Sequence, residues 1–157
     1  MHDLVTLAAS DASDDDVLAA ASRTAGEAIG HDLCTAMRFH PATIEVERIH
    51  SSLPDAYPPG GRKPKKDTSW GRHVLTDGQV YVGGEDAIRA AFTDHDLIFG
   101  LGLRFVANIP VRSRGQVVGT FNLLSGSIDY STRDLSTLHL IAGLLAARVL
   151  VPDTRRA

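Results

Sequence analysis

The stretch LRFVANIPVRSRGQVVGTFNLLS, residues 103–125, is typical of two long strands joined by a tight turn at Gly115. We expect a three-residue loop, residues 114–116, with Gly115 in the left-handed conformation. This loop places Asn108 opposite Asn122 and Ile109 near Phe121, whereas a two-residue loop would mix polar and apolar side chains on both faces. One face of the predicted hairpin is then apolar (Phe105, Ala107, Ile109, Val111, Phe121 and Leu123) and the other carries Arg104, Asn108, Thr120 and Asn122.

The part of the chain before this hairpin predicts a helix and a second pair of strands. Apolar residues at helical spacing indicate a helix over Asp14–Ile29, capped by Ser13 and ended by Gly30. Strands are expected at Leu33–His40 and Thr43–Ser51. A two-residue turn at residues 41–42 would pair Phe39 with Ile44, Met37 with Val46 and Arg38 with Glu45.

The middle of the chain is a long excursion from the sheet. Residues 53–67 are rich in proline, glycine and lysine, and we interpret the basic residues Arg62, Lys63, Lys65 and Lys66 as part of a solvated loop. A short helix over Ser69–Leu75, a short strand over Gln79–Val82 and a helix over Glu85–Asp94 follow. After the long hairpin, Ser131 and Asp134 open a last helix with a broad apolar surface, and Pro152 ends it.

Composition places the chain among ordinary globular proteins. At 157 residues it suits one domain, residues 1–157 with a core at about 14–150. A net charge of −3 gives no argument for nucleic acid or membrane partners. Because Cys34 is the single cysteine and no apolar run reaches about 18 residues, we expect a cytoplasmic location without internal disulfides.

The C-terminal part of the sequence resembles the end of a GAF domain. The resemblance rests on the apolar-Pro-apolar step at residues 109–111, on the Gly-x-x-Asn strand at residues 119–122 and on the helix start at residues 130–135. Element order extends it over about residues 14–150, as in a stand-alone GAF domain protein. It implies an α+β fold: a five- or six-stranded antiparallel sheet with the terminal helices on one face and a small-molecule pocket on the other.

GAF domains serve several chemistries, and the residues of this chain argue against the best known. Methionine sulfoxide reduction by GAF proteins needs an attacking and a resolving cysteine, and this chain has only Cys34, which we interpret as a buried structural thiol. Residues 52–103 offer no cysteine for covalent bilin attachment, and the cyclic-nucleotide signature is not visible as a set. Neither a zinc-binding histidine pair nor a nucleophile elbow occurs, so we expect no catalytic residue, no metal and no cofactor.

The predicted pocket lies between the long hairpin and the middle excursion. Its ligand-binding residues are expected to be Arg104, Asn108, Asn122 and Thr120 on one wall, with Trp70, His73, Tyr81, Phe92 and Phe99 as lining. Arg104 suits a carboxylate or phosphate, although an ion pair with Asp86, Asp94 or Asp96 remains an alternative. Alternatively, the two asparagines hydrogen-bond each other, Trp70 simply packs in the core, and His73 packs on the surface.

These patterns lead to a functional hypothesis. The sequence favours a non-enzymatic sensory or regulatory GAF protein that binds a polar or anionic metabolite and forms a homodimer through its terminal helices, with or without a further protein partner. One alternative is a structural or interaction module whose pocket is closed by side chains. A second alternative, an enzyme similar to methionine sulfoxide reductases, is disfavoured by the cysteine count.

Overall fold

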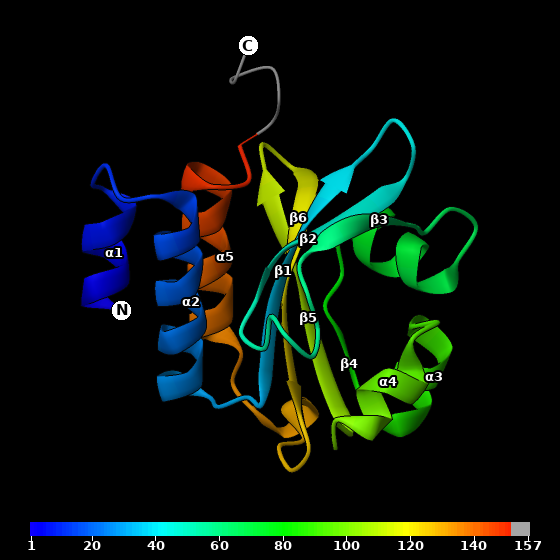
Figure 1. The fold of residues 1–157 in the computed structure, drawn as a ribbon. Helices are drawn as coiled ribbons and strands as arrows, with labels where there is room; N and C mark the ends of the chain where they lie inside the picture. Colours follow the sequence, from blue (N-terminus) through cyan, green and yellow to red (C-terminus); the bar gives the residue numbers. More distant parts are fainter. Residues whose placement is uncertain (152–157) are drawn as a thin grey trace.

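Six antiparallel strands form one sheet in the order β3-β2-β1-β6-β5-β4 in the computed structural model, which describes residues 1–151 (Figure 1). This confirms the predicted α+β fold with an antiparallel sheet of five or six strands. The strands are β1 (Leu33–His40), β2 (Glu45–Ser51), β3 (Gly60–Pro64), β4 (Tyr81–Gly83), β5 (Phe105–Ser113) and β6 (Gln116–Ser125).

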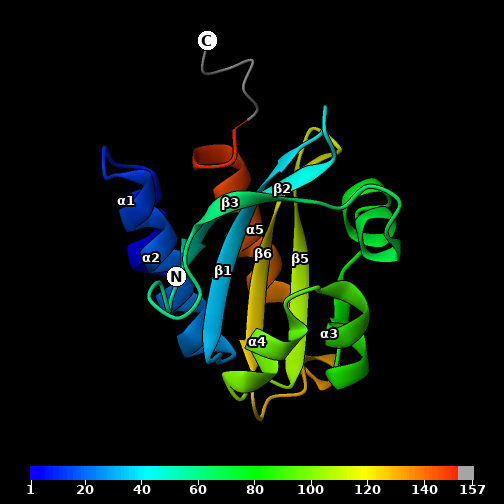
Figure 2. The same cartoon turned by 45° about the vertical axis from the view of Figure 1, so that its right-hand side comes forward.

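Helices cover both faces of the sheet. One face carries the terminal helices α1 (His2–Ala8), α2 (Asp14–Ala28) and α5 (Ser136–Arg148), and the other carries the π-helix η1 (Gly71–Thr76), α3 (Glu85–Ala91) and α4 (His95–Gly100), as Figures 1 and 2 show. A 3-10 turn, η2 (Tyr130–Thr132), precedes α5. No helix within residues 1–151 is long and apolar enough to span a membrane.

The main core lies between the terminal helices and the predicted apolar face of the hairpin. Ala107, Ile109, Val111, Phe121 and Leu123 are all completely buried there, as the alternation predicts. Each large apolar side chain buried in this way contributes roughly 1.5–3 kcal/mol. Helix α1, which the sequence analysis did not predict, adds the fully buried Leu4 to the same core.

The β5–β6 hairpin has the predicted register but a different turn. Asn108 pairs with Asn122 and Ile109 with Phe121. The expected three-residue loop is wrong: the turn is Arg114–Gly115, with φ of +53° and +78°, and a β-bulge at Val111/Arg112 supplies the missing residue. Two consecutive positive φ values match the right-handed strand twist, which explains why the tighter turn forms.

In the β1–β2 hairpin the observed register differs from the predicted one by two residues. Phe39 pairs with Val46 and Met37 with Arg48, because the connection is four residues long, residues 41–44, rather than two. Ile44, at φ +53°, ends this connection. A shift of two residues leaves every side chain on its predicted face, since side chains alternate with a period of two.

The ends of the two longest helices follow their capping residues. Ser13 Oγ accepts a hydrogen bond from Asp16 N at 3.1 Å at the start of α2, and Gly30 follows its end with φ +99°. Helix α5 begins at Ser136, later than predicted, because Asp134 Oδ1 accepts from Ser136 N at 2.9 Å. Pro152, the predicted end of this helix, lies outside the described residues.

Two predictions in the middle of the chain are corrected. The helix expected over Glu85–Asp94 ends early, because α3 stops at Ala91 where Phe92 takes an extended conformation, and α4, which the sequence analysis did not predict, begins at His95. The basic segment expected to be a solvated loop contains the edge strand β3, and Lys65 directly after it is buried. Helix η1 and strand β4 lie within a few residues of their predicted positions.

Candidate functional site

A buried relay of polar side chains crosses the sheet face that η1, α3 and α4 cover. Trp70 Nε1 donates to Asn108 Oδ1 at 3.0 Å, Asn108 Nδ2 donates to Asn122 Oδ1 at 2.8 Å, and Asn122 Nδ2 donates to Thr35 Oγ1 at 3.1 Å. All four residues are buried, and they come from the start of η1 and from β5, β6 and β1. Buried amides stay in a protein core only when they are hydrogen-bonded, so these four positions depend on one another.

The relay borders a small cavity of about 30 Å³. A cavity of this size holds only one or two water-sized molecules, so the site is closed in this structure. Its walls are both polar and apolar, as small-molecule sites are. The lining consists of Thr35, Met37, Arg48, Tyr57, Phe92, Ile98, Asn108, Asn122 and Leu124.

Lys65 lies next to this cavity, and the residue is only 6% exposed to solvent. Its Nζ is 5.1 Å from the ring centroid of Trp70 and 5.5 Å from that of Phe92. Burial, and next the charge of Lys63, lower the pKa of Lys65 below its usual value. Among residues 1–151 no carboxylate lies within ion-pair distance of this ammonium group, so its contacts are with aromatic faces.

Asp94 connects the edge strand β3 to the start of α4. Its Oδ2 accepts from Lys63 Nζ at 2.7 Å and from Tyr57 Oη at 2.9 Å. Burial opposes ionisation of Asp94, but the hydrogen bond and charge of Lys63, with smaller effects of Tyr57 and Arg48, hold the pKa of Asp94 below its usual value. Asp94 is therefore an ionised carboxylate that holds the middle excursion together.

Arg48 is the cation that directly lines the cavity. Its guanidinium group lies 3.7 Å from the ring centroid of Tyr57, and Nη1 donates to Pro58 O at 2.8 Å. The Nε atom is buried and has no hydrogen-bond partner within the described chain. A buried N–H without an acceptor is costly for the folded state.

The structure brings together some of the residues predicted for the pocket. Asn108 and Asn122 line the cavity and bond each other, while Trp70 is packed in the core and donates to Asn108. Thr120 is fully buried on the same sheet face, outside the cavity lining, and its Oγ1 has no partner among the described residues. Tyr81 pairs with Asn108 across the strands and donates its hydroxyl to Ala87 O at 2.7 Å.

The other predicted residues lie away from the cavity. Arg104 forms an ion pair, as its alternative interpretation predicted, but the partner is Glu85 at 3.0 Å and none of the three expected aspartates. Arg104 also donates to Phe99 O at 3.0 Å. Its guanidinium group also lies 5.4 Å from the Phe99 ring centroid. His73 is exposed, with Nε2 2.9 Å from Val80 O. Neither Arg104, His73 nor Phe99 is part of the cavity lining.

Sequence reasoning missed several residues of the site: Thr35, Arg48, Tyr57, Lys63, Lys65 and Asp94. Two of them carried a usable signal. Thr35 is two residues from Met37 on β1, and Arg48 is two residues from Val46 on β2, so all four lie on the sheet face of Asn122. The burial of Lys65 carried no local signal, since Lys66 beside it has the same side chain and is exposed.

Two further features lie outside this site. Cys34 is completely buried on the opposite sheet face, and burial raises its pKa to about 12, which disfavours the thiolate that cysteine chemistry requires. A more open groove of about 350 Å³ runs between β5 and α5, where Arg112, His139 and Gly143 are exposed. Residues 1–151 contain no cluster of three or more histidine, cysteine or acidic side chains that would hold a metal ion.

The GAF domain family model matches residues 15–149. The chain belongs to the GAF family. Similar solved GAF structures include the GAF domain of a two-component sensor histidine kinase from Bacillus halodurans, at 19% identity and TM-score 0.70 over 92% of this chain and 97% of that one. No curated protein sequence matches the chain.

Other structures of this GAF fold come from proteins with quite different activities. The phycoerythrobilin-bound GAF domain of a cyanobacterial phytochrome matches at 12% identity and TM-score 0.73, over 99% of this chain and 95% of that one. Free methionine-R-sulfoxide reductase from Neisseria meningitidis, in complex with its substrate, matches at 18% identity and TM-score 0.67, over 92% of this chain and 83% of that one. At these identities the likeness shows a shared fold and leaves the ligand open.

Proposed function

We propose that this GAF domain is a non-enzymatic sensory or regulatory module that binds a polar or anionic small molecule in the cavity beside Asn108 and Asn122. One observation carries the proposal: the Trp70–Asn108–Asn122–Thr35 relay places directed amide groups against a cavity whose other walls are mostly apolar. Of the residues predicted from the sequence, Asn108, Asn122, Trp70, Thr120 and Tyr81 stay in this proposal as the wall and its support. Arg104, His73 and Phe99 have no role in it.

Similar solved structures from signalling proteins support a sensory role. Structures similar to this chain include the GAF domain of a two-component sensor histidine kinase and part of a methyl-accepting chemotaxis protein. Because the cavity is closed around about 30 Å³, a metabolite can enter only if the middle excursion moves away from the sheet. Binding would then change the order of this segment, which is a signal that a partner protein can read.

The closed cavity also favours a second candidate function. A GAF domain whose pocket is filled by its own side chains would act as a structural or interaction module and would bind no metabolite. The small cavity volume and the complete hydrogen bonding of the relay are the observations on its side. Ligand binding distinguishes the two candidates.

A thermal-shift screen of polar and anionic metabolites tests the first candidate. Leu124→Phe fills the cavity that Leu124 lines, and Leu97→Phe makes the same change at an exposed position on α4. We expect at least one metabolite to raise the melting temperature of the wild type and of Leu97→Phe, and to have a smaller effect on Leu124→Phe. A panel that stabilises none of the proteins, or all three equally, supports the closed module instead.

We also propose the setting in which the domain works. Residues 1–157 act as one domain with the core at about 14–150, in the cytoplasm, where a single buried cysteine needs no disulfide partner. The terminal helices form a homodimer, and the outward side of α5 supports this, since Leu140 is 64% exposed there. A partner protein is the other candidate for the same surface.

A further inference from the structure

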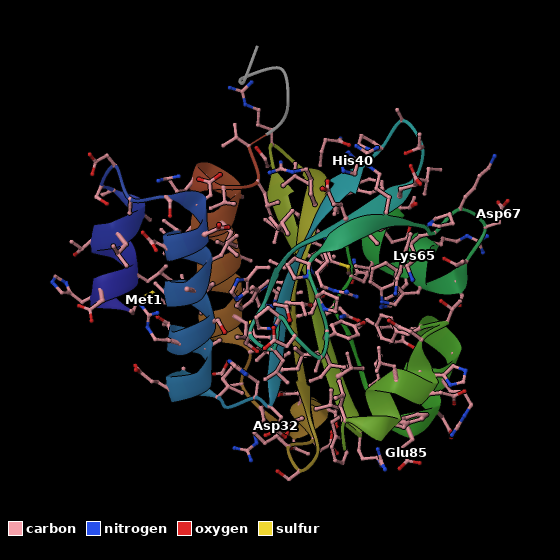
Figure 3. The ribbon with its side chains drawn as sticks, viewed as in Figure 1. Met1, Asp32, His40, Lys65, Asp67 and Glu85 are labelled. Atoms are coloured by element: carbon pink, nitrogen blue, oxygen red, sulfur yellow. The ribbon has the colours of Figure 1, made fainter. Side chains whose placement is uncertain are left out.

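Four charged side chains from separate segments meet beside the cavity. Arg48 comes from β2, Lys63 from β3, Lys65 from the turn after β3 and Asp94 from the start of α4, and their charges influence one another. Figure 3 shows Lys65 at the end of β3, beside the helix that follows in the chain. The cluster holds three cations and one carboxylate, so it has a net charge of about +2 in a partly buried place.

The carboxylate compensates only part of this charge. Asp94 contacts Lys63 at 2.7 Å and takes its second hydrogen bond from Tyr57. Arg48 and Lys65 have no carboxylate within ion-pair distance inside residues 1–151, although Lys65 is 94% buried and Arg48 Nε is fully buried. A buried cation without an anion destabilises a folded protein, and the aromatic contacts of both side chains offset only a part of that cost.

We infer that Arg48 and Lys65 form an anion-binding subsite, and that the ligand presents a carboxylate or phosphate group to them while its neutral polar part faces the Asn108–Asn122 amides. This inference rests on the proposed function and assigns the ligand class of the same cavity. The positions fit, because Arg48 lines the cavity together with both asparagines, and Lys65 contacts Phe92, which lines it too. An oxyanion there would accept from Arg48 Nε and compensate the Lys65 ammonium.

Removing the charge of Asp94 should change the anion affinity in the opposite direction from removing Lys65. As the carboxylate of the cluster, Asp94 competes with an incoming anion for the same positive charge. Replacing it by asparagine removes this competition and raises the positive charge by one. A subsite of this kind should therefore bind anions more weakly without Lys65 and more tightly without the Asp94 charge.

Calorimetric titration with three probes tests the subsite: succinate, inorganic phosphate and succinamide, the neutral analogue of succinate. The variants are Lys65→Met, which keeps the apolar packing against Trp70 and Phe92, Asp94→Asn, and Lys66→Met as the control, since Lys66 is exposed and carries the same charge one residue away. We expect succinate or phosphate to bind the wild type and Lys66→Met alike. Lys65→Met should bind at least about tenfold more weakly and Asp94→Asn more tightly, and succinamide should not bind the subsite.

The choice between succinate and phosphate identifies the anionic group. Tighter binding of succinate assigns a carboxylate ligand, and tighter binding of phosphate assigns a phosphate ligand. Equal binding by Lys65→Met and the wild type, an equal loss in Lys66→Met, or binding of succinamide as tight as that of succinate overturns the inference. So does a wild type that binds neither anion.

The melting temperature of the ligand-free proteins separates a binding role of Lys65 from a structural one. Removal of an uncompensated buried cation should raise the melting temperature of Lys65→Met by about 2–4 °C, with no change in Lys66→Met. A lower melting temperature would make Lys65 a structural residue and overturn the inference. If Lys65→Met does not fold, this structural role is established, and Arg48→Gln with unchanged succinate and phosphate affinities would independently overturn the subsite.

The proposed function and this inference fail in different ways. If neither anion binds the wild type but a neutral metabolite still stabilises it and not Leu124→Phe, the cavity binds ligands and only the anion subsite is wrong. If no ligand of any charge distinguishes the wild type from Leu124→Phe, the proposed function fails as well.

Discussion

Asn108 is the central residue of the buried relay, because its amide both accepts and donates. It accepts from Trp70 Nε1 and donates to Asn122 Oδ1, and its side chain is 1% exposed. Trp70 opens the η1 helix, while Asn122 belongs to the centre of the sheet. One side chain thus connects the middle excursion to the sheet beneath it.

Replacing Asn108 by leucine should destabilise the protein, although leucine is of similar size. The change leaves the indole N–H of Trp70 and the side-chain oxygen Oδ1 of Asn122 buried without partners, and each unpaired group costs about 1–3 kcal/mol. Urea denaturation measures this loss. Gln116→Leu, an exposed change on the same hairpin, is the control and should cost less than about 0.5 kcal/mol. Equal stabilities of the two variants would mean that the relay contributes nothing to folding.

The residue scale also shows what sequence reasoning can reach. The Asn108–Asn122 contact follows from strand alternation and from a register that only one choice of faces satisfies. Lys65 differs, because its burial depends on η1 packing closely: a Cβ on Gly71 would lie 2.4 Å from Lys65 O. Arg104 was expected on the pocket wall but lies away from the cavity, because it pairs with Glu85 of α3, a contact that strand alternation does not reveal.

At the scale of elements, the β5–β6 turn combines a favourable glycine with an unfavourable arginine. Both Arg114 and Gly115 have positive φ, a conformation that costs a residue with a side chain roughly 1–2 kcal/mol. The turn forms nevertheless, because the long strands on both sides bury a large apolar face. The three-residue loop was expected from the alternation of the two faces alone, but the bulge at Val111/Arg112 keeps the same Asn108–Asn122 register with a two-residue turn.

Arg114→Asn should stabilise this hairpin. Asparagine tolerates the left-handed region, and Asn-Gly is the preferred pair for such turns, so we expect a gain of roughly 0.5–1 kcal/mol in urea denaturation. Gly115→Ala, which places a Cβ at φ +78°, should shift stability in the opposite direction. No change in either variant would show that the turn in solution has a different conformation.

At the scale of the whole molecule, the resemblance to GAF domains implied the layer order and periodicity identified the long elements, whereas the short segments could not be predicted. Long amphipathic elements such as α2 and the β5–β6 hairpin carry enough periodic residues to identify their faces. Helix α1 and strand β3 are short, and nothing within them distinguishes them from loops. Their positions are determined by the larger elements that they cover.

The proposed homodimer is also a property of the whole molecule. If α5 lies at the dimer interface, Leu140→Glu places a charge in an apolar contact and should convert the dimer to a monomer without unfolding it, because Leu140 is 64% exposed in the monomer. Sedimentation velocity measures the change. Leu97→Glu, at a 47% exposed position on the opposite face, should remain dimeric. A wild type that sediments as a monomer at high concentration contradicts the proposal.

The strand order has a kinetic consequence. The β1–β2 and β5–β6 pairs are local hairpins, but the central β1–β6 pair joins Leu33 to Leu124. The sheet can therefore become continuous only when a loop of about 90 residues closes, and such non-local pairing makes folding slow. The middle excursion lies wholly inside this loop, so the two halves of the sheet must meet before the cavity has a complete floor.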